Sequence, residues 1–196
     1  YELRVQNMNP FWQFMDPLIY VAESSFASGV FRVGSNAFMS IEASSDSLFY
    51  GQNKFYDIRS TINTSKTTSS GDVLASGYIE SRKQKLNIIS ATEYLKVEAY
   101  WDKDHIDFRG GLNQSDSKNN VHVAGEMNFT KEGFDLHFKE SKLEVLDEKW
   151  SLKPKNRIEF KNNLIEFRDF SLASGKQYLT VDGKYSDTGI QDILLS

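Results

Sequence analysis

Apolar and polar residues alternate along most of this chain with a period of two. The clearest example is the run from His105 to Arg109, in which Ile106 and Phe108 alternate with polar or charged residues. This period is typical of a β-strand that buries one face. Similar runs follow one another from Leu18 onwards, and the connections between them are mostly short, which favours antiparallel neighbours. The sequence therefore predicts an all-β fold built on a long antiparallel sheet.

One phrase, an alternation of apolar and acidic residues that ends at arginine, occurs three times. The copies cover residues 55–59, 105–109 and 164–168, which are separated by 50 and then 59 residues. After a spacer, each copy is followed by a second apolar alternation that ends at glycine. This repeat is longer than one hairpin, so each unit should contain several strands. We therefore expect residues 1–196 to form a single repetitive β domain, which we interpret as a fragment of a larger protein.

Residues 10–17 interrupt the alternation. Pro10 suits the first turn of a helix, and Pro17 limits its length. The sequence therefore predicts one short helix near residues 10–17, which either caps the end of the sheet or serves as a membrane-surface or plug element. The apolar residues at helical spacing are Phe11, Phe14, Met15 and Leu18.

The predicted sheet has too many strands to stay flat, because strand twist accumulates at roughly 20–25° per strand. Since alternation places the apolar side chains on one face, we expect the sheet to curl lengthwise into an open trough lined by that face. Two polar stretches, Asn63–Asp72 and Leu112–Asn120, are expected to be loops. The residues expected to be largely buried are Trp150, Ile158, Phe160, Ile165 and Phe167. The residues expected to line a groove for lipid or other cargo are Tyr56, Ile58, Val97, Ile106, Phe108, Val123, Met127, Phe129, Ile165, Phe167 and Val181.

The composition excludes several classes of protein. The chain has 14 Phe, 9 Tyr and 3 Trp, which is too many aromatic residues for a disordered chain. The net charge is −4 and charges of both signs are interleaved, so there is no basic stripe for nucleic acid. The chain has no cysteine, which excludes a disulfide frame and a thiolate metal site.

Residue types that carry catalysis are present, but not in a catalytic pattern. His105, His122 and His137 are far apart in the sequence, whereas a zinc site needs three or four ligands that converge. Asp102 and Asp104 would be a carboxylate pair for acid–base chemistry, although a solvated turn is the better interpretation. The chain has no nucleophile elbow and no phosphate-binding glycine loop. The sequence therefore predicts a protein that is not an enzyme and needs no metal or cofactor.

One segment follows the pattern W-x-L-x-x-x-N-x-I-x-F, and after an apolar strand it continues as Q-x-L-x-V-x-G. This pattern resembles the TamB (translocation and assembly module) family of Gram-negative bacteria, especially divergent members of the Bacteroidetes type. The resemblance covers about a sixth of the chain. The matching residues are Trp150, Leu152, Asn156, Ile158, Phe160, Gln177, Leu179, Val181 and Gly183.

The resemblance implies a large periplasmic protein that is anchored in the inner membrane by an N-terminal helix. It implies a sheet folded lengthwise into an apolar-lined trough, often called a β-taco, as in AsmA-like and bridge-like lipid-transfer proteins. The implied role belongs to outer-membrane biogenesis in the cell envelope: lipid transport, or protein translocation and assembly. An outer-membrane BamA-like barrel protein is an expected partner.

Two classes of function stay open at this point. The first is a non-enzymatic periplasmic segment whose apolar groove shields phospholipid acyl chains, or nascent outer-membrane β-strands, between the inner and outer membranes. The second is an extracellular β-sandwich binding or adhesin module that recognises carbohydrate or protein through Trp12, Trp101 and Trp150. A continuous apolar stripe would favour the first class, and a closed core with exposed tryptophans would favour the second.

Overall fold

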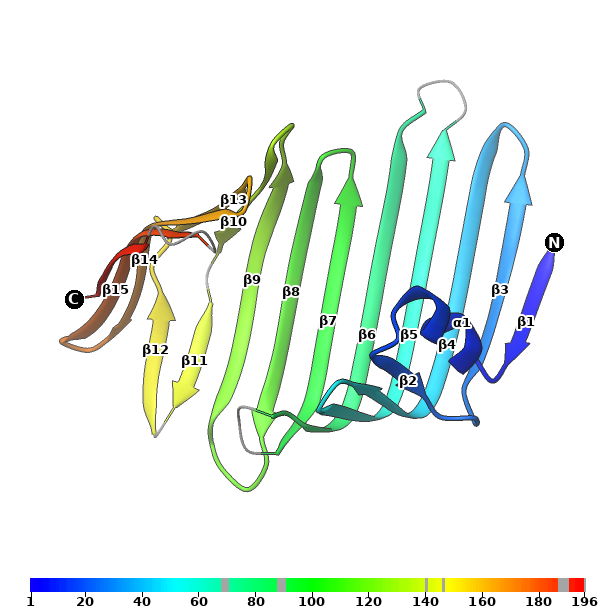
Figure 1. The fold of residues 1–196 in the computed structure, drawn as a ribbon, viewed down its shortest axis with the longest axis horizontal. Helices are drawn as coiled ribbons and strands as arrows, with labels where there is room; N and C mark the ends of the chain where they lie inside the picture. Colours follow the sequence, from blue (N-terminus) through cyan, green and yellow to red (C-terminus); the bar gives the residue numbers. More distant parts are fainter. Residues whose placement is uncertain (68–70, 88–90, 140, 146, 187–190, 196) are drawn as a thin grey trace. The chain divides into compact units, whose positions relative to one another are not determined.

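The computed structural model describes residues 1–67, 71–87, 91–139, 141–145, 147–186 and 191–195 (Figure 1). Its strands form one long antiparallel sheet, and one short helix accompanies them. For these residues the predicted all-β class, the long antiparallel sheet and the short helix near residues 10–17 are confirmed. The elements are β1 (Glu2–Gln6), α1 (Asn9–Met15), β2 (Ile19–Val21), β3 (Phe26–Val33), β4 (Asn36–Tyr50), β5 (Asn53–Thr67), β6 (Val73–Lys85), β7 (Thr92–Asp102), β8 (His105–Gln114), β9 (Asn120–Phe129), β10 (Gly133–Phe138), β11 (Lys142–Val145), β12 (Glu148–Leu152), β13 (Arg157–Lys161), β14 (Leu164–Ser174), β15 (Gln177–Ser186) and β16 (Gln191–Leu195).

Contacts divide the chain into two compact units. Unit 1 comprises Tyr1–Lys103 and Gly111–Ser117, and unit 2 comprises Asp104–Gly110 and Lys118–Ser196. Strand β8 contributes residues to both units. The single repetitive domain expected over residues 1–196 stays a prediction.

In unit 1 the strand register gathers apolar residues on one face of the sheet. Ile41 of β4 lies opposite Ile62 of β5, and Ile79 of β6 lies opposite Val97 of β7. Directly opposed residues point to the same side of a sheet, so these pairs share a face. The intervening positions carry polar residues such as Arg59, and they form the other face.

Unit 2 shows the same division of faces. One row crosses four strands through Met127, Leu136, Ile158 and Phe167, each directly opposite the next. The adjacent row points to the other side and is polar or charged. Its members are Asn128, Asp135, Glu159, Glu166 and Lys184.

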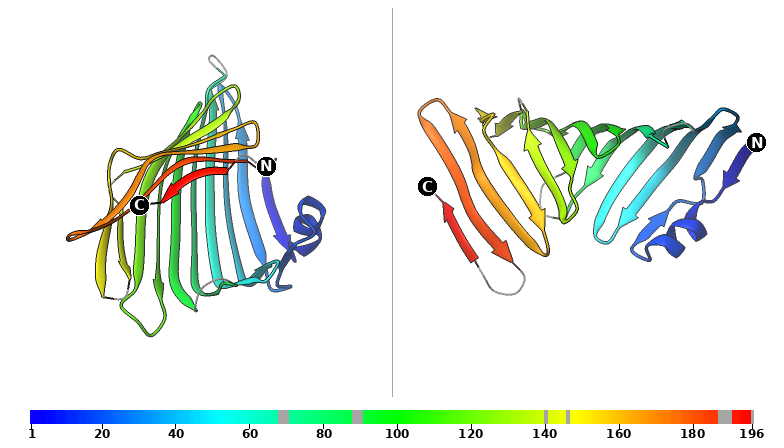
Figure 2. Two further views of the ribbon diagram at one scale, coloured as in Figure 1. Left: turned by 60° about the vertical axis from the view of Figure 1, so that its left-hand side comes forward. Right: turned by 90° about the horizontal axis from the view of Figure 1, so that it is seen from above.

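A line of missing pairs crosses strands β4 to β7 of unit 1, and we call it the break line. The β4–β5 ladder omits the pair of Asp46 with Asp57. The next two ladders omit the pairs that Arg82 would make with Asp57 and with Tyr94. Asp57 and Tyr94 have positive φ angles of 51° and 56°, a conformation that tyrosine rarely adopts. Figure 2 shows that β4, β5 and β6 change direction near one end.

The alternation of side chains changes phase at the break line. Ser45 and Leu48 lie on either side of it, three residues apart on β4, yet both line the same apolar cavity. Their partners across the sheet, Ile58 and Val21, line that cavity too. In an uninterrupted strand, residues three apart face opposite sides. The break therefore lets the apolar face of unit 1 continue past the bend.

Strand β14 of unit 2 changes phase in the same way. Its register shifts between Phe167 and Phe170, and Asp169 between them has a φ of 52°. The rings of Phe167 and Phe170 have centroids 6.4 Å apart, so both lie on one face although they are three residues apart. Further gaps in this part of the sheet separate β10 from β11, which both pair with β9, and β12 from β13, which both pair with β14.

Buried polar side chains replace hydrogen bonds at the break line. Ser81 is 2% exposed, and its hydroxyl lies 2.8 Å from the carbonyl oxygen of Tyr56 and 3.1 Å from that of Lys83. The Gln84 amide donates to the carbonyl and the hydroxyl oxygens of Ser81 at 2.7 and 3.0 Å. The Thr92 hydroxyl in turn donates to Gln84 Oε1 at 3.0 Å. Since a buried unpaired polar group costs about 1–3 kcal/mol, this network stabilises the bend.

Serines serve the same purpose at two further gaps. Ser25 lies between β2 and β3, and its Oγ accepts the backbone N–H of Met8 at 2.8 Å. Ser141 lies between β10 and β11, and its Oγ accepts the backbone N–H of Ala124 at 3.2 Å. Both serines are buried, at 3% and 1% exposure. The two units therefore solve the same hydrogen-bonding problem with the same residue type.

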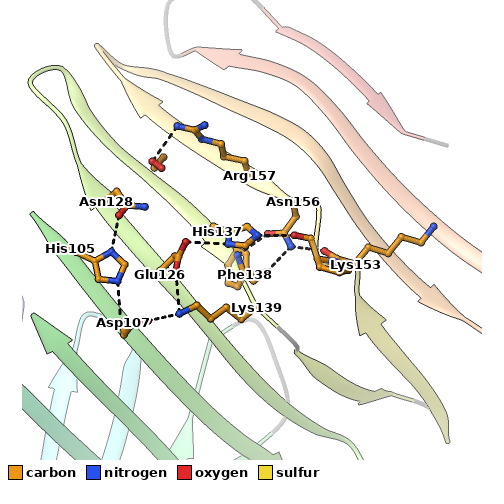
Figure 3. Close-up of polar contacts among 12 residues, drawn as sticks. His105, Asp107, Glu126, Asn128, His137, Phe138, Lys139, Lys153, Asn156 and Arg157 are labelled. Atoms are coloured by element: carbon orange, nitrogen blue, oxygen red, sulfur yellow. Dashed lines mark hydrogen bonds and ion pairs between the residues drawn. The ribbon is translucent and has the colours of Figure 1, made fainter.

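Asn156 fills the gap between β12 and β13 (Figure 3). Its Oδ1 accepts the N–H of Phe138 at 2.8 Å, and its Nδ2 donates to the carbonyl oxygens of Phe138 and Lys153 at 2.8 and 2.6 Å. The amide thus makes both hydrogen bonds that a strand residue would exchange with Phe138. This gives a physical reason for an asparagine at this position of the segment that resembles the TamB family.

Few apolar side chains of the described residues are fully buried, and many on the apolar faces keep part of their surface exposed. Among the five residues expected to be largely buried, Ile158 is 9% exposed and meets the expectation. The other four are largely but not fully buried, since each keeps a minor part of its surface exposed: Trp150, Phe160, Ile165 and Phe167. In the described part of the chain the buried apolar residues are Val21, Ala27, Ile58, Leu152 and Ile158.

The two stretches expected to be loops are in part strand. Strand β5 continues through Asn63 to Thr67, and β8 continues through Leu112 to Gln114. The polar side chains of these stretches belong to a sheet with a polar face, where they hydrogen-bond across strands, as the Ser40 hydroxyl does to Asn63 Oδ1 at 2.7 Å. Polar composition alone therefore does not end a strand here.

Replacing Ser81 with alanine should lower the free energy of unfolding by about 1–3 kcal/mol, because the Tyr56 carbonyl and the Gln84 amide each lose a buried hydrogen-bond partner. Urea unfolding followed by circular dichroism measures this loss. The control is Ser76→Ala, which removes a half-buried hydroxyl from the polar face of the same strand and should cost less than about 0.5 kcal/mol. Equal losses in the two variants would contradict the role given to Ser81.

Candidate functional site

A cavity of about 470 Å³ opens on the apolar face of unit 1. Strands β4 to β7 provide Ile58, Ile79 and Val97, while β2 and α1 provide Val21 and Trp12. The volume lies in the range of about 300–1,000 Å³ that is typical of small-molecule sites. The bend at the break line is what brings side chains from β2 and from the long strands around one space.

Hydrogen bonds hold helix α1 beside this cavity. Asn9 Oδ1 accepts the N–H of Val21 at 3.1 Å, and the N–H of Met8 bonds to the buried Ser25. In Figures 1 and 2 the helix lies on one side of the unit 1 sheet, next to β2. Trp12 faces the cavity, whereas Phe14 is 86% exposed.

No charged residue belongs to the described lining of this cavity. Its polar members are four serines and Tyr78. The register places the Tyr78 side chain on the polar face, like Ser76, where its hydroxyl donates to Glu80 at 2.5 Å; this hydrogen bond, followed by burial, raises the pKa of Tyr78 to about 12. An ionised group inside the cavity would find no counter-ion, whereas a hydrocarbon chain needs none.

Three of the expected groove residues belong to unit 1, and the structure brings two of them together. Ile58 and Val97 line the cavity, and Tyr56 does not. Tyr56 and Ile58 lie on either side of Asp57, where the positive φ changes the phase of the alternation. The spacing of two residues therefore fails to place Tyr56 on the cavity side.

The other expected groove residues belong to unit 2, where they share an apolar face that is rich in phenylalanine. The ring of Phe108 contacts that of Phe138 edge-on at 6.0 Å between centroids, and Phe138 contacts Phe170 at 6.1 Å. Phe129 and Ile165 lie on the same rows as Phe134 and Phe160, whose rings stack at 4.5 Å. Val181 lies opposite Phe170. The unit 2 set is Ile106, Phe108, Val123, Met127, Phe129, Ile165, Phe167 and Val181.

The glycines that close two copies of the repeat have different surroundings. A Cβ on Gly125 would lie 2.5 Å from Phe108 Cζ and 2.7 Å from the His137 carbonyl oxygen. Only glycine fits there, because Phe108 packs directly on the backbone. A Cβ on Gly77 would have nothing within 4 Å, and Gly77 lines the unit 1 cavity. Gly77 thus leaves open space in the unit 1 cavity, whereas Gly125 allows the ring of Phe108 to contact the backbone.

A network of ion pairs covers the polar face of unit 2. At its centre the Glu159 side chain is 5% exposed and lies 3.2 Å from Arg157, 3.0 Å from Lys161 and 3.3 Å from Arg168. The hydrogen bond from Lys161 is the largest cause that lowers the pKa of Glu159, and the charges of Arg168 and Arg157 act in the same direction, against burial. The alternation predicted a charged face here, but it did not single out Glu159 as its centre.

A second polar cluster lies on the same face, around His105 (Figure 3). His105 Nδ1 is 2.7 Å from Asn128 Oδ1, and Nε2 is 3.1 Å from Asp107 Oδ2. The hydrogen bond with Asn128, followed by that with Asp107, raises the pKa of the imidazole. Lys139 Nζ lies 2.5 Å from Asp107 and 3.1 Å from Glu126. The hydrogen bonds from Lys139 lower the pKa of both carboxyl groups.

The sequence analysis kept these residues apart. It treated His105 and His137 as separate strand histidines, whereas His137 Nδ1 lies 3.4 Å from Glu126 and His105, Asp107 and Glu126 offer ligand atoms within 4.8 Å of one another. The available signal was the spacing of His105 and Asp107, which places both on one face of a strand. The contribution of Glu126 depends on the position of β9 beside β8 and has no local signal.

Comparison of the chain with protein-family models, with curated proteins and with solved structures gave no match. In the described residues no helix combines the length and the apolar character needed to span a membrane. The resemblance to the TamB family stays a prediction.

Replacing Glu159 with glutamine should lower the free energy of unfolding by about 1–3 kcal/mol at pH 7, because three cations lose a buried carboxylate. The folded-state pKa of Glu159 is lowered, so its contribution is complete above the ordinary value near 4.5 and disappears as the pH falls through the folded-state value. Urea unfolding at several pH values should therefore show a difference between the two proteins that vanishes in acid. Glu132→Gln, at an exposed turn, is the control and should have little effect at any pH.

Proposed function

We propose that this chain is a non-enzymatic segment of a cell-envelope protein whose apolar groove shields acyl chains from water. The observation that carries the proposal is the 470 Å³ cavity of unit 1, which has an apolar lining and no charged residue among its described members. Acyl chains match this lining, because they gain free energy from apolar contact alone.

The apolar face of unit 2 supports the same function. Its phenylalanine rings keep part of their surface exposed, and Phe129 is 39% exposed, so a strip of aromatic and aliphatic surface stays partly open to solvent. An apolar strip that stays partly open to solvent suits a flexible chain better than a ligand of one fixed shape. We extend the proposal to nascent outer-membrane β-strands as a second cargo, because a chain with one apolar face meets the same surface.

The cellular setting is proposed from the resemblance to the TamB family. In this proposal the parent protein is anchored in the inner membrane, its sheet forms an open trough in the periplasm, and a BamA-like barrel protein receives it at the outer membrane. The alternative is an extracellular β-sandwich binding module that recognises carbohydrate or protein. The apolar, uncharged described lining of the unit 1 cavity favours the groove.

Trp12 provides a direct test, because it lines the cavity. In a variant with Trp101→Phe and Trp150→Phe, Trp12 is the only tryptophan, and a brominated fatty acid below its micellar concentration should quench its fluorescence. Each methylene sheltered from water contributes about 0.8 kcal/mol, so the dissociation constant should fall by up to roughly fourfold per added methylene until the cavity is filled.

Gly77→Leu supplies the blocking variant, because a side chain at this position extends into open space in the cavity. It should abolish the quenching of Trp12 while the circular dichroism spectrum stays unchanged. The matched control, Ser76→Leu, places the same side chain on the opposite face of the same strand and should bind as the parent does. Absence of quenching before any substitution, or equal binding by both leucine variants, would contradict an acyl site in this cavity.

A further inference from the structure

The cluster around His105 has the composition of a metal site. His105 and Asp107 lie two residues apart on β8, Glu126 comes from β9, and the three offer ligand atoms within 4.8 Å of one another. Figure 3 shows their side chains converging on one side of the sheet. Imidazole nitrogen and carboxylate oxygen are both zinc ligands, and zinc sites with three protein ligands leave a fourth position open.

The ring of His105 is already oriented for a ligand. Nδ1 lies 2.7 Å from Asn128 Oδ1, an acceptor, so a proton on Nδ1 donates to the amide oxygen. Nε2 points into the cluster, 3.1 Å from Asp107 Oδ2, and a proton on Nε2 makes that hydrogen bond; a metal ion would displace this proton and take the lone pair of Nε2. Metal-binding histidines have the same arrangement, with one nitrogen held by a second residue and the other on the ion.

Glu126 is positioned in a similar way from the other side. His137 Nε2 lies 2.7 Å from the carbonyl oxygen of Pro154, which only accepts, so this nitrogen carries a proton. His137 Nδ1 therefore faces Glu126 Oε1 at 3.4 Å with a lone pair when the ring is neutral. Two acceptor atoms then face each other on this side of the cluster, and a cation relieves that conflict.

Lys139 supplies the cation in this structure. Its Nζ bonds to Asp107 and Glu126, so the ammonium group occupies the side of the carboxylates that an ion would use. The Lys139 side chain is 46% exposed and lies just beyond the end of β10, which leaves it room to turn into solvent. A metal ion and Lys139 should therefore compete for the same two carboxylates.

We propose that His105, Asp107 and Glu126 bind a divalent transition-metal ion of the zinc class, and that Lys139 is the internal competitor that weakens this binding. The imidazole ligand favours zinc, nickel or copper over calcium or magnesium. The ligand side chains are 28% to 49% exposed, so an ion reaches the site without opening the fold. The site is separate from the proposed acyl cavity, which lies in unit 1.

The experiment is a zinc titration by calorimetry, on protein freed of any affinity tag and treated with chelator. His105→Ala should weaken zinc binding at least tenfold. Asp107→Asn, which keeps the side-chain shape, should weaken it as well and covers the case in which the alanine variant fails to fold. The chain contains one matched control, His122→Ala, an exposed histidine on β9, and this change should leave the affinity unchanged.

Because Lys139 competes with the metal ion, removing its charge should strengthen zinc binding. Lys139→Met keeps the length of the side chain and removes its charge, so it should tighten zinc binding about tenfold. Co²⁺ bound to this variant should shift the NMR signals of the His105 ring far more than those of His122. If wild type and Lys139→Met both fail to bind zinc at millimolar concentration, or if His105→Ala binds as tightly as His122→Ala, the cluster is only an ion-pair network and the proposal is wrong.

Discussion

A β-sheet that bends across its strands loses ladder hydrogen bonds at the bend, and this constraint organises both units. A buried peptide group without a partner costs about as much as several well-packed methylenes gain, so a bend survives only where another group takes the place of the ladder. Here the substitutes are side chains: the Ser81–Gln84–Thr92 network, the hydroxyls of Ser25 and Ser141, and the amide of Asn156. The residues at under 2% exposure in the described chain are accordingly polar.

The bend also decides what the apolar face can do. Because the alternation changes phase there, Ser45 and Leu48 both face the cavity, and Phe167 and Phe170 both lie on the apolar face of unit 2. Without the change of phase, the apolar residues beyond the bend would lie on the polar face of the sheet. The strained φ angles of Asp57, Tyr94 and Asp169 therefore serve to keep hydrophobic surface on one side.

The sequence predicted what depends on period-two alternation, and it missed what depends on register. The strand character of His105–Arg109, the charged face of β14 and the short helix with Pro10 in its first turn follow from local pattern. The position of Tyr56 does not, since one residue in the left-handed region reverses the pattern and aspartate gives only a weak signal for it. The meeting of His105 with Glu126 depends on the alignment of two strands. The partial exposure of Phe167 depends on how far side chains from other strands cover it, which the local pattern does not encode.

The two faces of unit 2 are not independent, because they share a backbone. Phe108 packs on Gly125 so closely that any side chain there would overlap its ring, and this contact sets how β8 lies against β9. Asp107 and Glu126 are the next residues on those two strands, and they point to the opposite face. The packing of one phenylalanine on one glycine therefore helps to fix the distance between two carboxylates on the other side of the sheet. A change on the apolar face of unit 2, such as an inserted chain that displaces Phe108, would also move the polar cluster, because only a single layer of backbone separates the two.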